Sequence, residues 1–142
     1  MPAVIHFFYE DTKFHFKFVK NTKSWLKDVI KNEAARLGEI NYIFCSDAFL
    51  HQINLEYLNH NTLTDIVTFD TADNPELIEG EIYISVDRVK ENARKFEVPF
   101  TDELHRVMVH GVLHLVGYFD KTPQQKKRMR KKEDAYLSLR SF

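Results

Sequence analysis

The sequence predicts an α+β fold, formed by a single domain over residues 1–142 with a small mixed sheet and packed helices. Two observations lead to this prediction. Short segments alternate apolar and polar residues as strands do, and longer segments repeat apolar residues at helical spacing. With 142 residues, 44% hydrophobic and 29% charged, the chain has the size and composition of an ordinary globular protein with a sizeable core.

The N-terminal third is predicted as two strands followed by a helix. Val4 to Tyr9 is apolar and extended in character. Phe14 to Phe18 alternates phenylalanine with polar residues, which favours a second short strand. A helix is expected from a cap at Asn21 or Thr22 to about Leu37, ended by Gly38.

The middle of the chain is predicted to alternate strand and helix. We expect a strand at Glu39 to Ser46, and then a helix capped by Asp47 that runs to about Tyr57. Thr64 to Asp70 is rich in β-branched residues, and Gly80 to Val86 alternates cleanly, so both are predicted strands. The acidic segment between them is a predicted loop.

The C-terminal half is predicted to be helical. A helix at Asp87 to Phe96 should stop before Pro99. Thr101 should cap the next helix, which carries a pair of histidines and ends at Gly117. Thr122 followed by proline should begin the last helix.

The histidine helix carries the most specific motif, His110-Gly-Val-Leu-His114-Leu-Val-Gly117-Tyr-Phe-Asp120. Histidines four residues apart share one helix face, so both imidazoles can reach a single metal ion. The turn at Gly117 can bring Asp120 to the same ion as third ligand. Two nitrogens and one oxygen leave a position open, as in catalytic zinc sites. We therefore predict one Zn²⁺ per chain, bound by His110, His114 and Asp120.

The spacing matches the histidine helix of zincins, but one residue of their chemistry is missing. Zinc peptidases place a glutamate directly after the first histidine as general base. Gly111 occupies that position, so a peptidase mechanism is disfavoured. An iron oxygenase can also use two histidines and a carboxylate, but no other feature of the sequence favours it.

Three segments resemble the YbeY family of rRNA maturation endoribonucleases. His110 to Asp120 is similar to the family's H-G-x-L-H-L-x-G-Y-D-H. Asn54-Leu-Glu-Tyr57 with Thr64-Asp-Ile-Val-Thr-Phe69 is similar to L-N-x-x-Y-R…P-T-D-V-L-S-F, and Gly80-Glu-Ile-Tyr-Ile-Ser85 to the strand G-D-I-x-I. The segments occur in the family's order, and the resemblance covers about Ile40 to Tyr136.

The resemblance implies a zinc-dependent, single-strand-specific endoribonuclease with a zinc metalloprotease-like fold, active in 16S rRNA 3′-end maturation and ribosome quality control. The implied partners are ribosomal RNA and the small ribosomal subunit, with ribosomal proteins or an assembly GTPase as further candidates and no membrane. The alternative is a ribosome-assembly or RNA-binding factor whose metal site is mainly structural.

The chain departs from the family pattern at two positions. Asp120 stands where the third ligand is usually histidine, and Leu58 stands where the family has an arginine thought to be catalytic. An arginine would stabilise charge that develops on a phosphoryl group. His60, Lys121 and Arg106 are candidate replacements. His60 is the best placed of them because its loop precedes Thr64, although an ordinary solvent-exposed histidine explains it equally well.

Thr64 and Asp65 are the remaining catalytic candidates. They could orient a ligand or substrate from the strand edge. Alternatively, Thr64 is a plain strand residue and Asp65 a buried acceptor for the histidine helix, where a carboxylate would itself tune the metal.

A basic run follows the metal motif. Six of the seven residues from Lys126 to Lys132 are basic, although the whole chain has a formal net charge of −1. Beside a metal such a run would attract an RNA backbone, with Lys126, Lys127, Arg130 and Lys131 as the candidate RNA-binding residues. The competing interpretation is a solvated helix face paired locally with Glu133 and Asp134.

Two further features bear on localisation. The chain has no apolar run long enough to span a bilayer and no charged-then-apolar leader, so we expect a cytoplasmic protein. A single cysteine, Cys45, excludes an internal disulfide and sits in an apolar stretch, which predicts a buried small side chain.

Overall fold

The protein is described by a computed structural model that covers residues 3–59 and 64–142. In chain order its elements are β1 (Val4–Glu10), α1 (Val19–Asn32), β2 (Arg36–Cys45), α2 (Asp47–Leu58), β3 (Ile66–Asp70), β4 (Leu77–Ser85), α3 (Val86–Phe96), α4 (Phe100–Val116) and α5 (Pro123–Ser138). The strands form one sheet in the order β1-β2-β4-β3. β1, β2 and β4 are parallel, and β3 is antiparallel to β4. The predicted α+β fold with a mixed sheet is confirmed.

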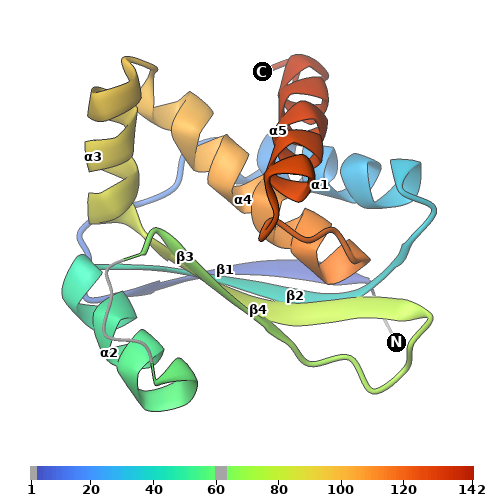
Figure 1. Ribbon diagram of the computed structural model, residues 1–142, viewed down its shortest axis with the longest axis horizontal. Helices are drawn as coiled ribbons and strands as arrows, with labels where there is room; N and C mark the ends of the chain where they lie inside the picture. Colours follow the sequence, from blue (N-terminus) through green and yellow to red (C-terminus); the bar gives the residue numbers. More distant parts are fainter. Residues whose placement is uncertain (1–2, 60–63) are drawn as a thin grey trace.

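Helices cover the two faces of this sheet unequally (Figure 1). α1, α3, α4 and α5 lie on one side, and α2 lies on the other. The side chains of β4 alternate between these layers, as period-two patterning requires. Ile82 is fully buried towards α4, whereas the ring of Tyr83 stacks with Phe49 of α2 at a centroid distance of 6.4 Å.

α4 lies directly on the sheet because it carries a glycine at the contact. A Cβ atom added at Gly111 would lie 3.0 Å from two carbon atoms of Ile82 and 3.2 Å from Ile66. Larger side chains here would lift the helix away from β3 and β4. Beside this contact, the hydroxyl of Tyr42 in β2 donates a 2.8 Å hydrogen bond to the carbonyl of Met108 and fixes the helix along the sheet.

The predicted strand at Phe14 to Phe18 is wrong. The segment is irregular, and its alternation arises because Phe14 and Phe16 turn inward onto Phe44 of β2, with centroid distances of 5.8 and 5.4 Å. Phe18 instead has φ 57° and is 64% exposed just before α1. Side-chain burial therefore produced a period of two without strand pairing.

The predicted helix to Leu37 is too long. α1 ends at Asn32, and Ala34 adopts a left-handed conformation with φ 57° although it is not a glycine. Pairing with β4 places Arg36 and Leu37 in β2, and Gly38 lies inside that strand, where its register with β4 shifts. Sheet pairing therefore overrides the helical spacing of Leu37.

The helix starts are confirmed in part. Thr122 and Gln125 form the capping box of α5, with Pro123 at its start. α2 is capped by Ser46, whose hydroxyl accepts a hydrogen bond from the amide of Phe49, and not by Asp47. α4 begins one residue before the predicted cap Thr101, with Pro99 at the N-cap position and no side-chain cap.

Candidate metal centre

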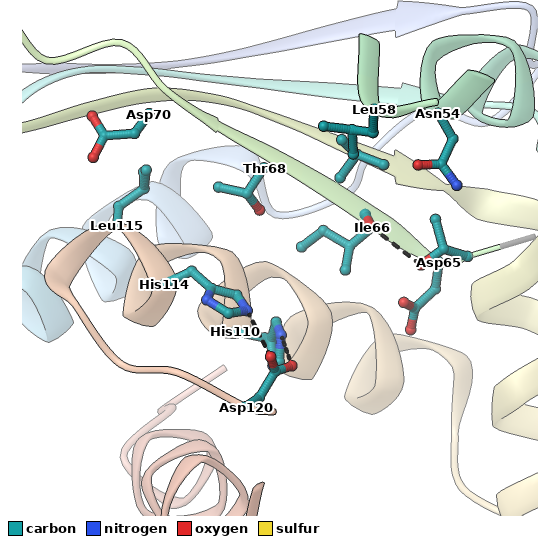
Figure 2. A pocket seen from close by; sticks show the side chains of 12 residues that line it. Asn54, Leu58, Asp65, Ile66, Thr68, Asp70, His110, His114, Leu115 and Asp120 are labelled. Atoms are coloured by element: carbon teal, nitrogen blue, oxygen red, sulfur yellow. Dashed lines mark hydrogen bonds and ion pairs between the residues drawn. The ribbon is translucent and has the colours of Figure 1, made fainter. Parts of the chain in front are cut away.

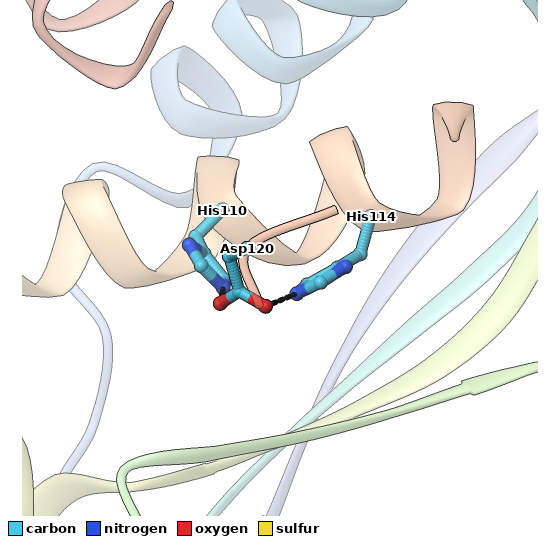
Figure 3. Close-up of side chains that lie close together, drawn as sticks. All are labelled: His110, His114 and Asp120. Atoms are coloured by element: carbon cyan, nitrogen blue, oxygen red, sulfur yellow. Dashed lines mark ion pairs between the residues drawn. The ribbon is translucent and has the colours of Figure 1, made fainter. Parts of the chain in front are cut away.

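The predicted metal motif converges on one point. His110 and His114 lie on the same face of α4, and Gly117, at φ 124°, turns the chain so that Asp120 returns to them (Figure 3). The Nε2 atoms of His110 and His114 lie 3.3 and 3.5 Å from the two carboxylate oxygens of Asp120. One ligand atom from each residue falls within 4.8 Å of the others, so the group could hold a metal ion.

A fourth side chain orients the first histidine. The Nδ1 atom of His110 is 2.7 Å from Oε2 of Glu133 in α5, and the side chain of Glu133 is only 6% exposed. Arg106 of α4 donates a 3.1 Å hydrogen bond to the other carboxylate oxygen. Because Nδ1 is engaged by a carboxylate, Nε2 of His110 is left to face Asp120, which is the arrangement that metal-binding histidines commonly show.

The pKa values of the two imidazoles shift in opposite directions. Burial lowers the pKa of His110, but the hydrogen bond and charge of Glu133, with the charges of Asp120 and Asp65, raise it above its ordinary value. Burial and the positive charge of His110 lower the pKa of His114. Of the two imidazoles in the metal-free site, His110 therefore binds a proton more tightly, and because metal ions need deprotonated ligands, metal binding competes with protons there.

The loop that carries Asp120 is anchored at Tyr118. The Tyr118 hydroxyl donates a 2.7 Å hydrogen bond to Glu33, just after α1. Glu33 also accepts from the hydroxyl of Tyr136 and from Lys132 at 3.1 Å, both in α5. Three segments distant in sequence thus hold the third candidate ligand in place.

The donor set suits a divalent transition metal. Two imidazole nitrogens and one carboxylate oxygen match zinc chemistry and leave a position for water or substrate. The same three ligands also suit other divalent ions. A carboxylate in place of the third histidine reduces the net positive charge of the site, so bound water would be less acidic than with three imidazoles.

Two cavities meet at this centre, and they differ in charge. A cavity of about 570 Å³ lies between β3, α2 and α4 (Figure 2). Asp65, Asp70 and Asp120 line it, and no basic lysine or arginine stands among its described lining residues. A second cavity of about 360 Å³ lies between α3, α4 and α5 and shares His110 and Asp120 with the first. Three cations line the second cavity: Arg106, Lys126 and Arg130.

Several of the other predicted site residues line these two cavities. Thr64 and Asp65 line the larger cavity with the triad. Burial raises the pKa of the Asp65 carboxyl, although the charge of His110 opposes this shift, and Asn92 donates a long 3.4 Å hydrogen bond to it. Thr64 donates its hydroxyl proton to the carbonyl of Ile66 at 3.3 Å. Their catalytic roles stay predictions, and His60 lies outside the described residues.

The basic run divides between two surfaces. Lys126 and Arg130 line the smaller cavity, whereas Lys127 and Lys131 are exposed and line neither cavity that contains the triad. The predicted local pairing of Glu133 is present as a 3.7 Å contact with Arg130, but its shorter contact is with His110. The sequence analysis missed this role. The only available signal was an acidic residue directly after a cationic run.

The sequence matches the family model described as Endoribonuclease YbeY over residues 5–140. The chain belongs to the YbeY family. A protein of Cytophaga hutchinsonii named Endoribonuclease YbeY is 50% identical over 97% of this chain and 96% of its own. A protein of the same name from Amoebophilus asiaticus is 49% identical, covering 96% of this chain and 94% of its own. The resemblance to YbeY proteins noted in three segments is confirmed.

A solved structure agrees with the fold. A protein of Thermotoga maritima with a known solution structure is 30% identical and superposes with a TM-score of 0.69, covering 95% of this chain and 87% of that protein. Leu58, for which the sequence resemblance implies an arginine in the family, lines the larger cavity, whereas Arg106 lines the smaller one and is paired with Glu133 and Asp134. Arg106 therefore does not replace the missing arginine in position.

Within the described residues, no helix is long and apolar enough to cross a membrane.

Proposed function

We propose that this protein is a zinc-dependent endoribonuclease that cuts single-stranded RNA during maturation of the 16S rRNA 3′ end, and that it contributes to ribosome quality control in the cytoplasm. One observation carries the proposal: His110 and Asp120, two members of the triad with His114, line the same cavity as Arg106, Lys126 and Arg130. Membership of the YbeY family supports the reaction and the substrate. The proposed partners are ribosomal RNA and the small ribosomal subunit.

Each residue has a defined part in this proposal. His110, His114 and Asp120 would hold one zinc ion, which when bound polarises a phosphodiester and acidifies water. Arg130 and Lys126, both exposed on α5, attract RNA phosphates to the cavity beside the triad. Asp65 lines both cavities next to His110, and this position supports its carboxylate as the acceptor of a proton from the attacking nucleophile.

One observation favours a second candidate function. The described residues that line the larger cavity include no lysine or arginine, and Leu58 occupies the position of the family's arginine. Without a cation there, charge that develops on that side of a scissile phosphate is less stabilised. An RNA-binding or ribosome-assembly factor, with a mainly structural metal, is the alternative that this absence supports.

The test is cleavage of a single-stranded fragment that spans the 3′ end of 16S rRNA by the purified protein, with zinc supplied. His114→Ala should abolish cleavage and lower the zinc content measured by elemental analysis. His15→Ala is the matched control, because His15 is exposed before α1 and lines neither cavity at the triad. Cleavage that persists in His114→Ala would refute the proposal. A wild-type protein that binds RNA without cutting it would establish the alternative.

A further inference from the structure

The smaller cavity has two chemically different walls. α5 contributes the cations Lys126 and Arg130, and α3 contributes Asn92 and Phe96. α3 and α5 stand on either side of α4 (Figure 1), and His110 of α4 reaches the same cavity. A volume of about 360 Å³ lies within the ~300–1,000 Å³ range typical of small-ligand sites. One wall is thus suited to phosphate and the other to a planar, partly polar group.

Phe96 is a half-exposed aromatic ring on that second wall, and the ammonium group of the neighbouring Lys95 lies 5.8 Å from its centroid. It is the last residue of α3 and continues the spacing of Val89 and Ala93, which are buried on the face of α3 that packs towards α4. Yet Phe96 is 49% exposed. The cavity therefore leaves open a ring that the helix pattern directs towards the protein. Exposed aromatic rings can stack nucleobases, because every base has an aromatic face.

Asn92 lies one turn before Phe96 on the same wall. Its side chain is partly buried, and its amide group donates the long 3.4 Å hydrogen bond to Asp65. An amide carries both donors and an acceptor, and these can pair with the edge of a base. A base that is already paired in a duplex has no free hydrogen-bonding group on its pairing edge.

The charges of the cavity are arranged by depth. The carboxylates of Glu103 and Glu133 are buried, at 6% and 4% exposure, whereas Lys126 and Arg130 are exposed. Glu133 is also neutralised by Arg106 at 3.1 Å. A phosphate is therefore attracted to the rim and an uncharged base is better suited to the interior.

We propose that this cavity is a binding subsite for one unpaired nucleotide next to the scissile phosphate, in which the base stacks on Phe96 and pairs with Asn92. The phosphate of that nucleotide lies against Lys126 and Arg130. The subsite rests on the proposed function and deepens it, because it explains a preference for single strands: a base inside a duplex has neither a free face nor a free edge.

The experiment measures binding of a fluorescently labelled single-stranded RNA to metal-free protein in a chelator, so that no cleavage occurs. Phe96→Ala should weaken binding about 5- to 150-fold, the range that a lost base–aromatic stack gives. Phe96→Trp should retain binding, and its new indole fluorescence should be quenched by the RNA. Phe8→Ala is the matched control, since Phe8 is 48% exposed on β1, at the sheet edge opposite β3. It should bind as the wild type does.

An abasic scan separates stacking from general loss of affinity. RNAs that lack one base at each successive position should reveal a position where the wild type and Phe8→Ala lose affinity. Phe96→Ala should be insensitive at that position, because the two losses report the same contact. Unchanged affinity of Phe96→Ala, or additive losses at every position, would overturn the subsite.

The two proposals fail differently. If Phe96→Ala binds RNA normally while the wild-type holoenzyme cuts RNA and His114→Ala does not, only the subsite is wrong. If Phe96→Ala loses binding but the zinc-loaded wild type leaves RNA intact, the subsite stands and the nuclease proposal falls.

Discussion

Replacing Glu133 by glutamine tests whether a buried carboxylate tunes the metal site. The change keeps the size of the side chain and an oxygen that can accept the proton of His110 Nδ1, but it removes the negative charge. The lost charge makes His110 a weaker ligand. Losing such an outer partner costs about 10- to 100-fold in metal affinity, equivalent to about 1.4–2.7 kcal/mol.

The same change should also destabilise the metal-free protein. Glu133 is 4% exposed and accepts a 3.1 Å hydrogen bond from Arg106, whose side chain is 20% exposed. Losing a hydrogen bond between charged groups costs about 1.5–3 kcal/mol. Arg106 keeps Asp134 at 2.6 Å, so we expect the lower part of that range.

Two measurements separate these effects. Competition with a chromophoric chelator gives the zinc affinity, and urea unfolding of the metal-free protein gives the free energy of unfolding. Asp134→Asn is the matched control, because it also removes a partner of Arg106, but Asp134 is 60% exposed and does not contact His110. Equal zinc affinity in Glu133→Gln and Asp134→Asn would refute the reasoning that the carboxylate acts through the imidazole.

The remaining predictions concern packing, pH and salt. Gly80→Ala should lower the free energy of unfolding by about 1–3 kcal/mol, because its Cβ would lie 2.6 Å from the carbonyl oxygen of Phe69. Burial and the charge of Arg140 lower the pKa of His105 to about 4. Below pH 6.5 the unfolded chain therefore binds more protons than the folded protein does. The free energy of unfolding should fall towards pH 4, by on the order of 3 kcal/mol in all. Lys126→Gln should weaken RNA binding and reduce the slope of log affinity against log salt by about 1.

Each of these predictions has a control variant. In Gly38→Ala the three atoms nearest to the added Cβ belong to the flexible side chain of Glu79 and not to the backbone, so it should destabilise less than Gly80→Ala in thermal unfolding. His105→Gln should flatten the difference between stability at pH 6.5 and pH 4, and an unchanged difference would contradict the assignment. Lys127→Gln, outside the cavity, should leave the salt slope nearer to that of the wild type. Equal slopes for the two lysine variants would argue for a diffuse basic surface.

The sequence predicted those features that local chemistry determines. The spacing of His110 and His114, the turn at Gly117 and the cap at Thr122 each depend on a few neighbouring residues, and the structure has all three. The sequence could not predict what depends on distant pairing. Ala34 ends α1 without a glycine because the following residues pair with β4. Phe14 and Phe16 alternate because they meet Phe44, from another strand.

The candidate site also combines features that neighbouring residues determine with features that depend on distant contacts. Asp120 follows the histidines closely, so its approach could be inferred from the motif alone. Glu133 lies 23 residues from His110, and its contact exists only because α5 packs back along α4. In sequence it looks like a partner for neighbouring cations. The two walls of the smaller cavity could likewise not be predicted, because Phe96 and Arg130 belong to different helices that line one cavity only in the folded chain.

The dependence of the triad on α5 has a consequence for synthesis of the chain. A nascent protein leaves the ribosome from its N-terminus, so the histidines of α4 emerge before Glu133 and before Tyr136, which helps to hold the anchor of the Asp120 loop. Until α5 has emerged and docked, His110 lacks its Nδ1 partner and the loop is only partly fixed. The site is therefore incomplete until α5 of the nascent chain has docked, while the ribosome that translates it carries RNA, chemically the same kind of molecule as its proposed substrate.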